Sequence, residues 1–164
     1  MNIHSPIPHR ISDYFVTVED RGEIAVRGTL KCSCGCEQFA LKYFGKKGSI
    51  FSPDIVKDRY DGEKRLVLVA QCKDCGKEIL VYDSITDGYD GDADAPAFDG
   101  PLEQFFCKGC GDQDFSLQIA YNSSGREALL EEGVENWQDK FSMILCSSSC
   151  RHCGKEYKGF VEQG

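Results

Sequence analysis

The ten cysteines of this 164-residue chain fall into four short clusters, and their spacing constrains the fold more than any other feature of the sequence. The clusters occupy residues 32–36, 72–75, 107–110 and 146–153. The tetrapeptide Cys-Gly-Lys-Glu occurs twice, at residues 75–78 and 153–156. In a reducing compartment, an even and patterned set of cysteines indicates metal binding or redox chemistry rather than a disulfide framework. The four clusters therefore predict two sites, each formed by two clusters.

The expected compartment is the cytoplasm. Residues 1–10 contain two prolines and no apolar run, which does not fit a signal peptide. No later stretch approaches the roughly 18 consecutive apolar residues of a membrane span. With 41% hydrophobic and 28% charged residues, the composition is typical of a soluble globular protein.

The two halves of the chain align with each other. Residues 34–41 match residues 110–117 at a shift of 76, and residues 72–78 match residues 150–156 at a shift of 78. The constant order and nearly constant shift indicate that one supersecondary unit is used twice. Between the inner cysteines lie 37 residues in the first unit and 39 in the second, which favours one metal ion within each unit.

Three clusters contain a Cys-x-x-Cys pair followed by glycine, at residues 72–76, 107–111 and 150–154. Two thiolates three residues apart converge on one tetrahedral ion when the chain turns tightly, and glycine tolerates the positive φ that such a turn often needs. The motif resembles the zinc-ribbon, rubredoxin-like family, in which two such knuckles at the tips of β-hairpins hold one metal. The resemblance covers roughly residues 31–82 and 105–161, and it implies a tandem of two zinc ribbons.

The first cluster departs from this motif because it offers Cys32, Cys34 and Cys36. Cys34 is the expected ligand because the repeat aligns it with Cys110. Cys32 is the second choice, as part of a knuckle one residue shorter, and Cys36 is the alternative to Cys32. Cys146 has no cysteine counterpart in the first unit and is expected to be a free thiol.

The predicted metal ligands are eight cysteines, four in each half: Cys32, Cys34, Cys72, Cys75, Cys107, Cys110, Cys150 and Cys153. Four thiolates without an open coordination position are typical of a structural site rather than a catalytic one. We expect two zinc ions per chain, with iron as the less expected metal. A unit of about 50 residues is small for a hydrophobic core alone, so metal binding is expected to be coupled to folding.

The segments around the clusters predict a mainly β fold with short helices. Runs of β-branched and aromatic residues predict a hairpin at residues 14–18 and 23–30, and strands at residues 66–69, 78–82, 141–145 and 156–161. Residues 126–132 predict a short helix with Ser124 as N-cap, and its equivalent lies within residues 52–60. The predicted domains are a hairpin plus first ribbon at 1–82, an acidic linker at 83–103 and a second ribbon at 104–164.

Charge bears on the partner. The net charge is −8, and residues 81–103 hold seven acidic and no basic side chains. A chain of this charge repels phosphate backbones, which makes nucleic-acid binding unexpected. Partial resemblance to a calcium loop makes calcium a minor alternative for the acidic segment. We expect this segment to be a solvated linker that a basic protein partner contacts, through the aspartates Asp87, Asp90, Asp92 and Asp94.

The sequence lacks the common catalytic motifs, so we expect a non-enzymatic, zinc-stabilised binding protein. One alternative is a nucleic-acid or transcription-related ribbon that binds through Lys42, Lys46 and Lys47, where lysines and aromatics alternate. The other is rubredoxin-like electron transfer by iron. The single tryptophan, Trp137, is expected either to anchor the core of the second unit or to contact a partner.

Overall fold

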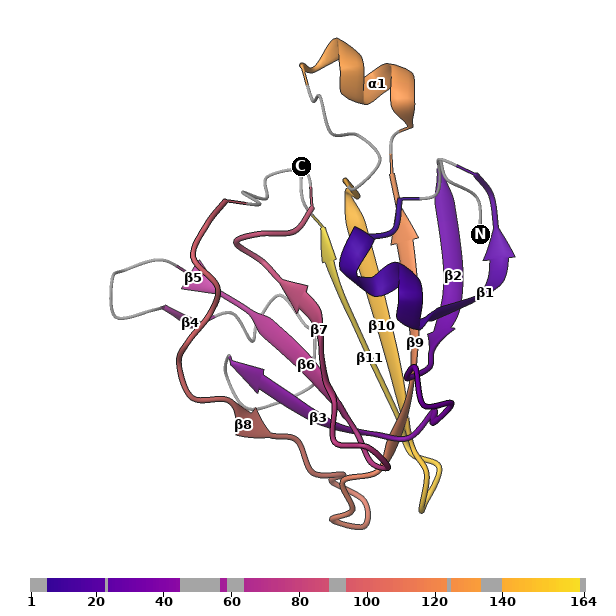
Figure 1. Cartoon of the computed structure of the whole chain (residues 1–164), viewed down its shortest axis with the longest axis vertical. Coiled ribbons are helices and arrows are strands. Elements are labelled where there is room, and N and C mark those ends of the chain that lie inside the picture. The colour runs from indigo at the N-terminus through magenta and orange to yellow at the C-terminus, as the bar shows by residue number, and fades with distance from the viewer. Residues whose placement is uncertain are drawn as a thin grey trace.

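The computed structural model is mainly β, as the sequence predicts (Figure 1). It describes residues 6–22, 24–44, 57–58, 64–88, 94–123, 125–133 and 140–162. Several residues singled out in the sequence lie outside the described residues, namely Lys46, Lys47, Asp90, Asp92 and Trp137. Within the described ranges, no helix combines the length and the apolar character that crossing a membrane requires.

The elements follow one another in the order η1 (a 3-10 helix, His9–Tyr14), β1 (Phe15–Asp20), β2 (Ala25–Leu30), β3 (Phe39–Phe44), β4 (Lys57–Asp58), β5 (Lys64–Arg65), β6 (Val67–Cys72), β7 (Glu78–Asp83), β8 (Glu103–Gln104), β9 (Phe115–Asn122), α1 (Arg126–Glu131), β10 (Met143–Cys150) and β11 (Glu156–Glu162). Nine strands form one sheet, in which neighbours along the main path are β1, β2, β9, β3, β6 and β7. β10 pairs with β9 and β11, and β8 pairs with β3. β4 and β5 form a separate pair.

The same three-stranded meander occurs in both halves, as the internal repeat predicts. β3, β6 and β7 in the first half correspond to β9, β10 and β11 in the second. The register agrees as well, because Phe39 is paired with Cys72 and Phe115 with Cys150. In both halves the cysteine that ends the middle strand therefore lies opposite the first residue of the first strand.

The two meanders meet at Phe39 and Phe115. These two residues are equivalent in the repeat, and they are antiparallel partners of each other. This pairing places an approximate two-fold axis between them. One row of the sheet then crosses four strands, in the order Cys72, Phe39, Phe115 and Cys150.

The N-terminal hairpin extends the sheet of the second meander. The hairpin itself is confirmed, because β1 and β2 pair antiparallel from Phe15 opposite Leu30. β2 also pairs with β9, from Ala25 opposite Asn122 to Thr29 opposite Gln118. The hairpin was predicted to belong with the first unit, but its strand partner lies in the second. The domain boundaries themselves stay predictions.

Buried side chains from both halves form one hydrophobic cluster. Residues of β9 alternate between buried and less buried positions, as expected for a strand with one face on a core. On the buried face, Tyr121 packs on Phe141 with ring centroids 5.1 Å apart, and Phe141 lies 6.2 Å from Tyr82 of the first half. Each such side chain stabilises the fold by about 1.5–3 kcal/mol. The core therefore joins the two halves.

The only α-helix in the described part of the chain, α1, projects from the end of the sheet (Figure 1). Its position confirms the helix predicted at residues 126–132. Its N-cap is Gly125 and it has no side-chain cap, while Ser124, the predicted cap, lies outside the described residues. In the segment predicted to be the equivalent helix, 52–60, the described residues 57–58 form β4 instead.

Candidate metal centres

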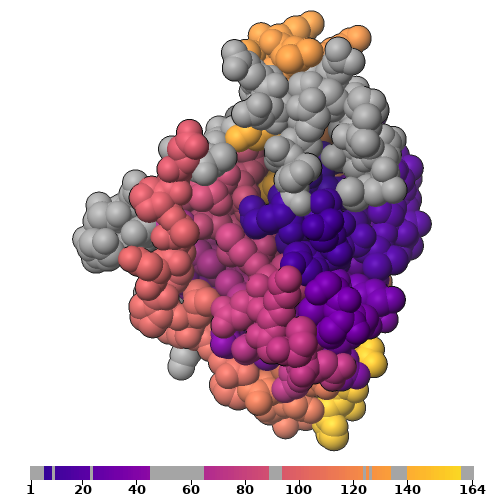
Figure 2. Space-filling view, viewed as in Figure 1, coloured from indigo at the N-terminus to yellow at the C-terminus, as the bar shows by residue number. Residues whose placement is uncertain are grey.

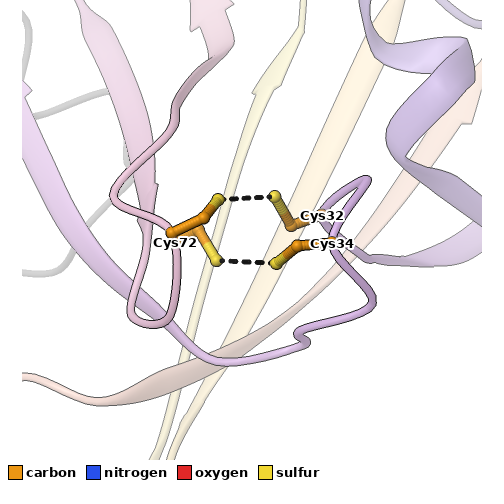
Figure 3. A group of neighbouring side chains, drawn as sticks. Cys32, Cys34 and Cys72 are labelled. Carbon is orange, nitrogen blue, oxygen red and sulfur yellow. Dashed lines mark hydrogen bonds between the residues drawn. The ribbon is translucent and has the colours of Figure 1, made fainter.

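The first group of thiols is formed by the turn before β3 and the turn between β6 and β7. The four Sγ atoms of Cys32, Cys34, Cys72 and Cys75 all lie within 4.8 Å of one another. The Sγ atoms of Cys32 and Cys75 are 3.5 Å apart, and so are those of Cys34 and Cys72. Figure 3 shows Cys32 and Cys34 on one turn facing Cys72 on the other. We call this group site 1.

The second group, site 2, repeats this arrangement in the other half. The Sγ atoms of Cys107, Cys110, Cys150 and Cys153 also lie within 4.8 Å of one another. Cys107 and Cys153 are 3.5 Å apart at Sγ, as are Cys110 and Cys150. In both sites one cysteine of each turn is buried and the other is exposed. Both sites therefore lie at the surface, where a metal ion could enter.

The turns that present these thiols share one backbone geometry. Cys72 N–H donates to the carbonyl of Lys77 at 2.9 Å, and Cys150 N–H donates to that of Lys155 at 2.9 Å. The glycines that follow the second cysteine of each turn all have positive φ: 95° at Gly35, 77° at Gly76, 79° at Gly111 and 80° at Gly154. Other residues are strained at such φ values, which explains the glycine in each motif.

The first knuckle uses Cys32 and Cys34, in the shorter form that the sequence favours. Cys32 N–H donates to the carbonyl of Cys36 at 2.8 Å, which closes a turn one residue shorter than that of Cys107 and Asp112. Cys36 is buried but does not belong to the group of four, and its Sγ lies 3.4 Å from the backbone nitrogen of Gln38. Cys146 is also separate from both groups, with 2% of its surface exposed.

The surroundings of the thiols shift their pKa values. Burial raises the pKa of Cys72, but N–H groups of Cys75 and Asp74 and nearby thiols outweigh it and lower the pKa to about 6. The hydroxyl of Tyr157 is the main group that lowers the pKa of Cys107 to about 6. Burial alone raises the pKa of Cys146 to about 12. Metal ligands bind as thiolates, so each site contains one cysteine that ionises readily while Cys146 stays protonated.

The donor set fits a tetrahedral metal. With metal–sulfur bonds of about 2.3 Å, the sulfurs of a four-cysteine zinc site are about 3.8 Å apart. The separations of 3.5 Å across each site are close to this value. Iron takes the same four-sulfur coordination. The chain is therefore able to hold two metal ions, and the geometry does not choose between zinc and iron.

The acidic segment begins with a buried ion-pair network rather than a solvated linker. Asp87 is 6% exposed and pairs with Arg10 of η1, whose Nη1 donates to Asp87 Oδ1 at 2.6 Å. Arg10 Nε donates to the carbonyl of Leu80 at 2.9 Å, which fixes η1 against β7. In Figure 2, the N-terminal segment, in indigo, lies beside magenta atoms of the first half. The burial of Asp87 removes its carboxylate from any surface that a partner contacts.

A second buried ion pair joins this network. Arg65 donates from Nε to Asp83 Oδ1 at 2.8 Å and from Nη2 to Asp83 Oδ2, and both side chains are almost fully buried. The N–H of Asp83 donates to Asp87 Oδ2 at 2.9 Å. Arg65 also lies over the ring of Phe98, with 5.4 Å from its guanidinium carbon to the ring centroid. Phe98 packs on Phe44 with ring centroids 4.7 Å apart, so the acidic segment is docked onto the first meander.

The remaining predicted binding residues are divided between the surface and undescribed segments. Asp94 is exposed. Lys42 forms an ion pair with Glu78 at 3.6 Å. Lys46 and Lys47, on which the nucleic-acid alternative also depends, are not among the described residues, nor are Asp90 and Asp92.

Comparisons with known proteins do not assign the chain to a family. No family model, curated protein or solved structure matches the chain.

Proposed function

We propose that the chain is a non-enzymatic binding protein built as two zinc ribbons, each stabilised by one zinc ion. The observation that carries this proposal is the pair of four-cysteine groups, in each of which four Sγ atoms lie within 4.8 Å of one another. Four thiolates fill the coordination sphere of a tetrahedral ion and leave no position for a substrate, which favours a structural role. The shared register of the two meanders supports a ribbon in each half.

Metal content is the first test. Native mass spectrometry and elemental analysis of protein purified without chelator should give two zinc ions per chain. Cys34→Ser and Cys110→Ser should each remove one ion, because each variant takes a ligand from a different site, whereas Cys146→Ser should remove none. Two iron ions and a coloured protein would favour rubredoxin-like electron transfer, and a chain without metal would overturn the proposal.

For the partner, we propose a protein with a basic surface that contacts the exposed part of the acidic segment. The net charge of −8 supports this choice. Asp94 and Asp99 are exposed, whereas Asp83 and Asp87 are buried in ion pairs. The exposed part of the acidic segment therefore offers negative charge to such a partner.

A lysine-rich peptide of fixed length is a suitable first probe for this surface. Fluorescence anisotropy should show salt-dependent binding to the metal-loaded protein. The double variant Asp94→Lys, Asp99→Lys should weaken binding. The matched control Asp20→Lys, Glu127→Lys makes the same charge change at exposed residues outside the segment and should have less effect. An equal loss of affinity in both variants would show that binding depends only on the net charge of the protein, which would refute the proposed surface.

A further inference from the structure

The two four-cysteine sites have the same ligands but different surroundings. Tyr157, the second residue of β11, places its hydroxyl 3.3 Å from Cys107 Sγ at site 2. The same hydroxyl oxygen accepts a hydrogen bond from Lys108 N–H at 2.8 Å. Because that oxygen already accepts from a backbone donor, its own proton is free to be donated to the sulfur. Gly109 N–H donates to the same Sγ at 3.4 Å.

The ring of Tyr157 is held in place by the core. It meets Phe105 edge-on at 5.0 Å and Phe115 at 6.3 Å, and the residue is buried. Phe115 is one of the two residues that join the meanders. The hydroxyl is therefore a fixed donor aimed at Cys107.

In the part of the chain that the structure describes, site 1 has no tyrosine hydroxyl at the equivalent position. The repeat places Ile79 at the position of Tyr157, and an isoleucine side chain cannot donate a hydrogen bond. Cys32 takes the place of Cys107, since its Sγ is 3.5 Å from that of Cys75 just as Cys107 is 3.5 Å from Cys153. In the described part of the chain, the hydrogen-bond contacts of Cys32 Sγ are with other thiols of site 1.

Site 1 also has a competing thiol. Cys36 is buried within the first knuckle, two residues from Cys34. The residue at the equivalent position of site 2 is Asp112, as the two turn-closing hydrogen bonds show. A neighbouring thiol offers a metal ion a replacement ligand during exchange. The two sites thus differ both in the donors that hold a ligand and in the ligands available to replace it.

We infer that the sites release metal unequally, with site 1 exchanging its ion faster and Tyr157 acting as the positioning residue that retains the ion at site 2. This inference rests on the proposed function, because it requires both sites to bind metal. Hydrogen bonds from outside the coordination sphere orient ligands, and losing one typically costs 10- to 100-fold in metal affinity. Site 1 behaves as the exchangeable site and site 2 as the permanent one.

The test is metal release from the zinc-loaded, full-length chain into excess chelator, followed with a metallochromic dye. We expect two phases of one equivalent each, with rates that differ by about 10-fold or more. Cys34→Ser should leave only the slow phase, and Cys110→Ser only the fast phase, which assigns each phase to a site. Equal rates for the two ions would overturn the inference, as would the reverse assignment.

Tyr157→Phe tests the role of the hydroxyl while keeping the ring. This variant should accelerate the slow phase about 10-fold or more and leave the fast phase unchanged. Tyr43→Phe is the matched control, because the Tyr43 hydroxyl interacts with Glu103 rather than with a cysteine, and it should change neither phase. In the cobalt-substituted protein, Tyr157→Phe should also shift the thiolate-to-metal charge-transfer band of site 2.

The outcomes separate this inference from the proposed function. Two zinc ions that leave together, or a Tyr157→Phe variant that releases metal like the wild type, refute the asymmetry but keep the zinc ribbons. A chain that binds no metal refutes the proposed function, and the asymmetry with it.

Discussion

At the scale of single residues, the ten cysteines differ mainly in what surrounds each sulfur. Eight have three other thiols within 4.8 Å, whereas Cys36 and Cys146 do not belong to either group. The sequence predicted all eight, including Cys32 in the irregular knuckle, because glycine after Cys34 fixed the position of the turn. It did not reveal Tyr157, whose role depends on a contact across 50 residues of sequence.

The choice of Cys32 over Cys36 leads to a prediction about site 1. Cys36→Ser should keep two metal ions per chain, because Cys36 lies outside the group of four thiols. Cys32→Ser removes a ligand, so it should weaken metal binding at site 1 by more than the roughly 10- to 100-fold cost of a lost supporting contact. Competition with a chelator of known affinity measures both effects. The opposite ranking of the two variants would make Cys36 the ligand.

The burial of Cys146 leads to a prediction about its reactivity. Burial raises the pKa of this thiol to about 12. At pH 8, one in about 10,000 molecules then carries the reactive thiolate, against roughly a quarter for a free cysteine of pKa near 8.5. Iodoacetamide should therefore leave Cys146 unmodified in the native, metal-loaded protein and label it in urea, as peptide mapping by mass spectrometry would show. Labelling at similar rates in both conditions would contradict the buried position.

At the scale of elements, sequence patterns predicted the strands on either side of the second cysteine turn of each half, but neither β3 and β9 nor how the strands combine. β6, β7, β10 and β11 lie where runs of β-branched and aromatic residues predict them. The pairing of β2 with β9 joins residues about 90 positions apart, and no local pattern specifies such a partner. The ion pairs of Arg10 with Asp87 and of Arg65 with Asp83 were also missed. Their partners lie in other segments, and charged residues in a polar segment are usually exposed.

The Arg65–Asp83 pair provides a prediction about the docking of the acidic segment. Arg65→Met leaves the Asp83 carboxylate buried without its partner and should lower the free energy of unfolding by about 3–5 kcal/mol. Arg21→Met is the matched control, because the Arg21–Glu19 pair is exposed and should contribute about 0–1 kcal/mol. Urea unfolding of the metal-loaded variants measures both. Similar losses of unfolding free energy in the two variants would mean that the buried pair stabilises the fold no more than the exposed pair does.

At the scale of the whole molecule, the two metal sites belong to one sheet. The row from Cys72 through Phe39 and Phe115 to Cys150 spans three strand spacings, or about 14–15 Å. Phe39 and Phe115 are both fully buried. We therefore expect disorder at one site to reach the other through this shared row and the common core, so the two repeats should not fold as independent units.

Amide hydrogen exchange of a site 1 variant tests this coupling. In Cys34→Ser, which should lose the metal of site 1, amides of β9 and β10 should lose protection along with those of β3 and β6, by about 10-fold or more in exchange rate, which corresponds to about 1.4 kcal/mol. Cys110→Ser should produce the reciprocal effect on β3 and β6, because coupling between two sites acts equally in both directions. Loss of protection confined to the mutated half in both variants would show that the Phe39–Phe115 junction transmits nothing, and that the halves are independent units sharing a sheet.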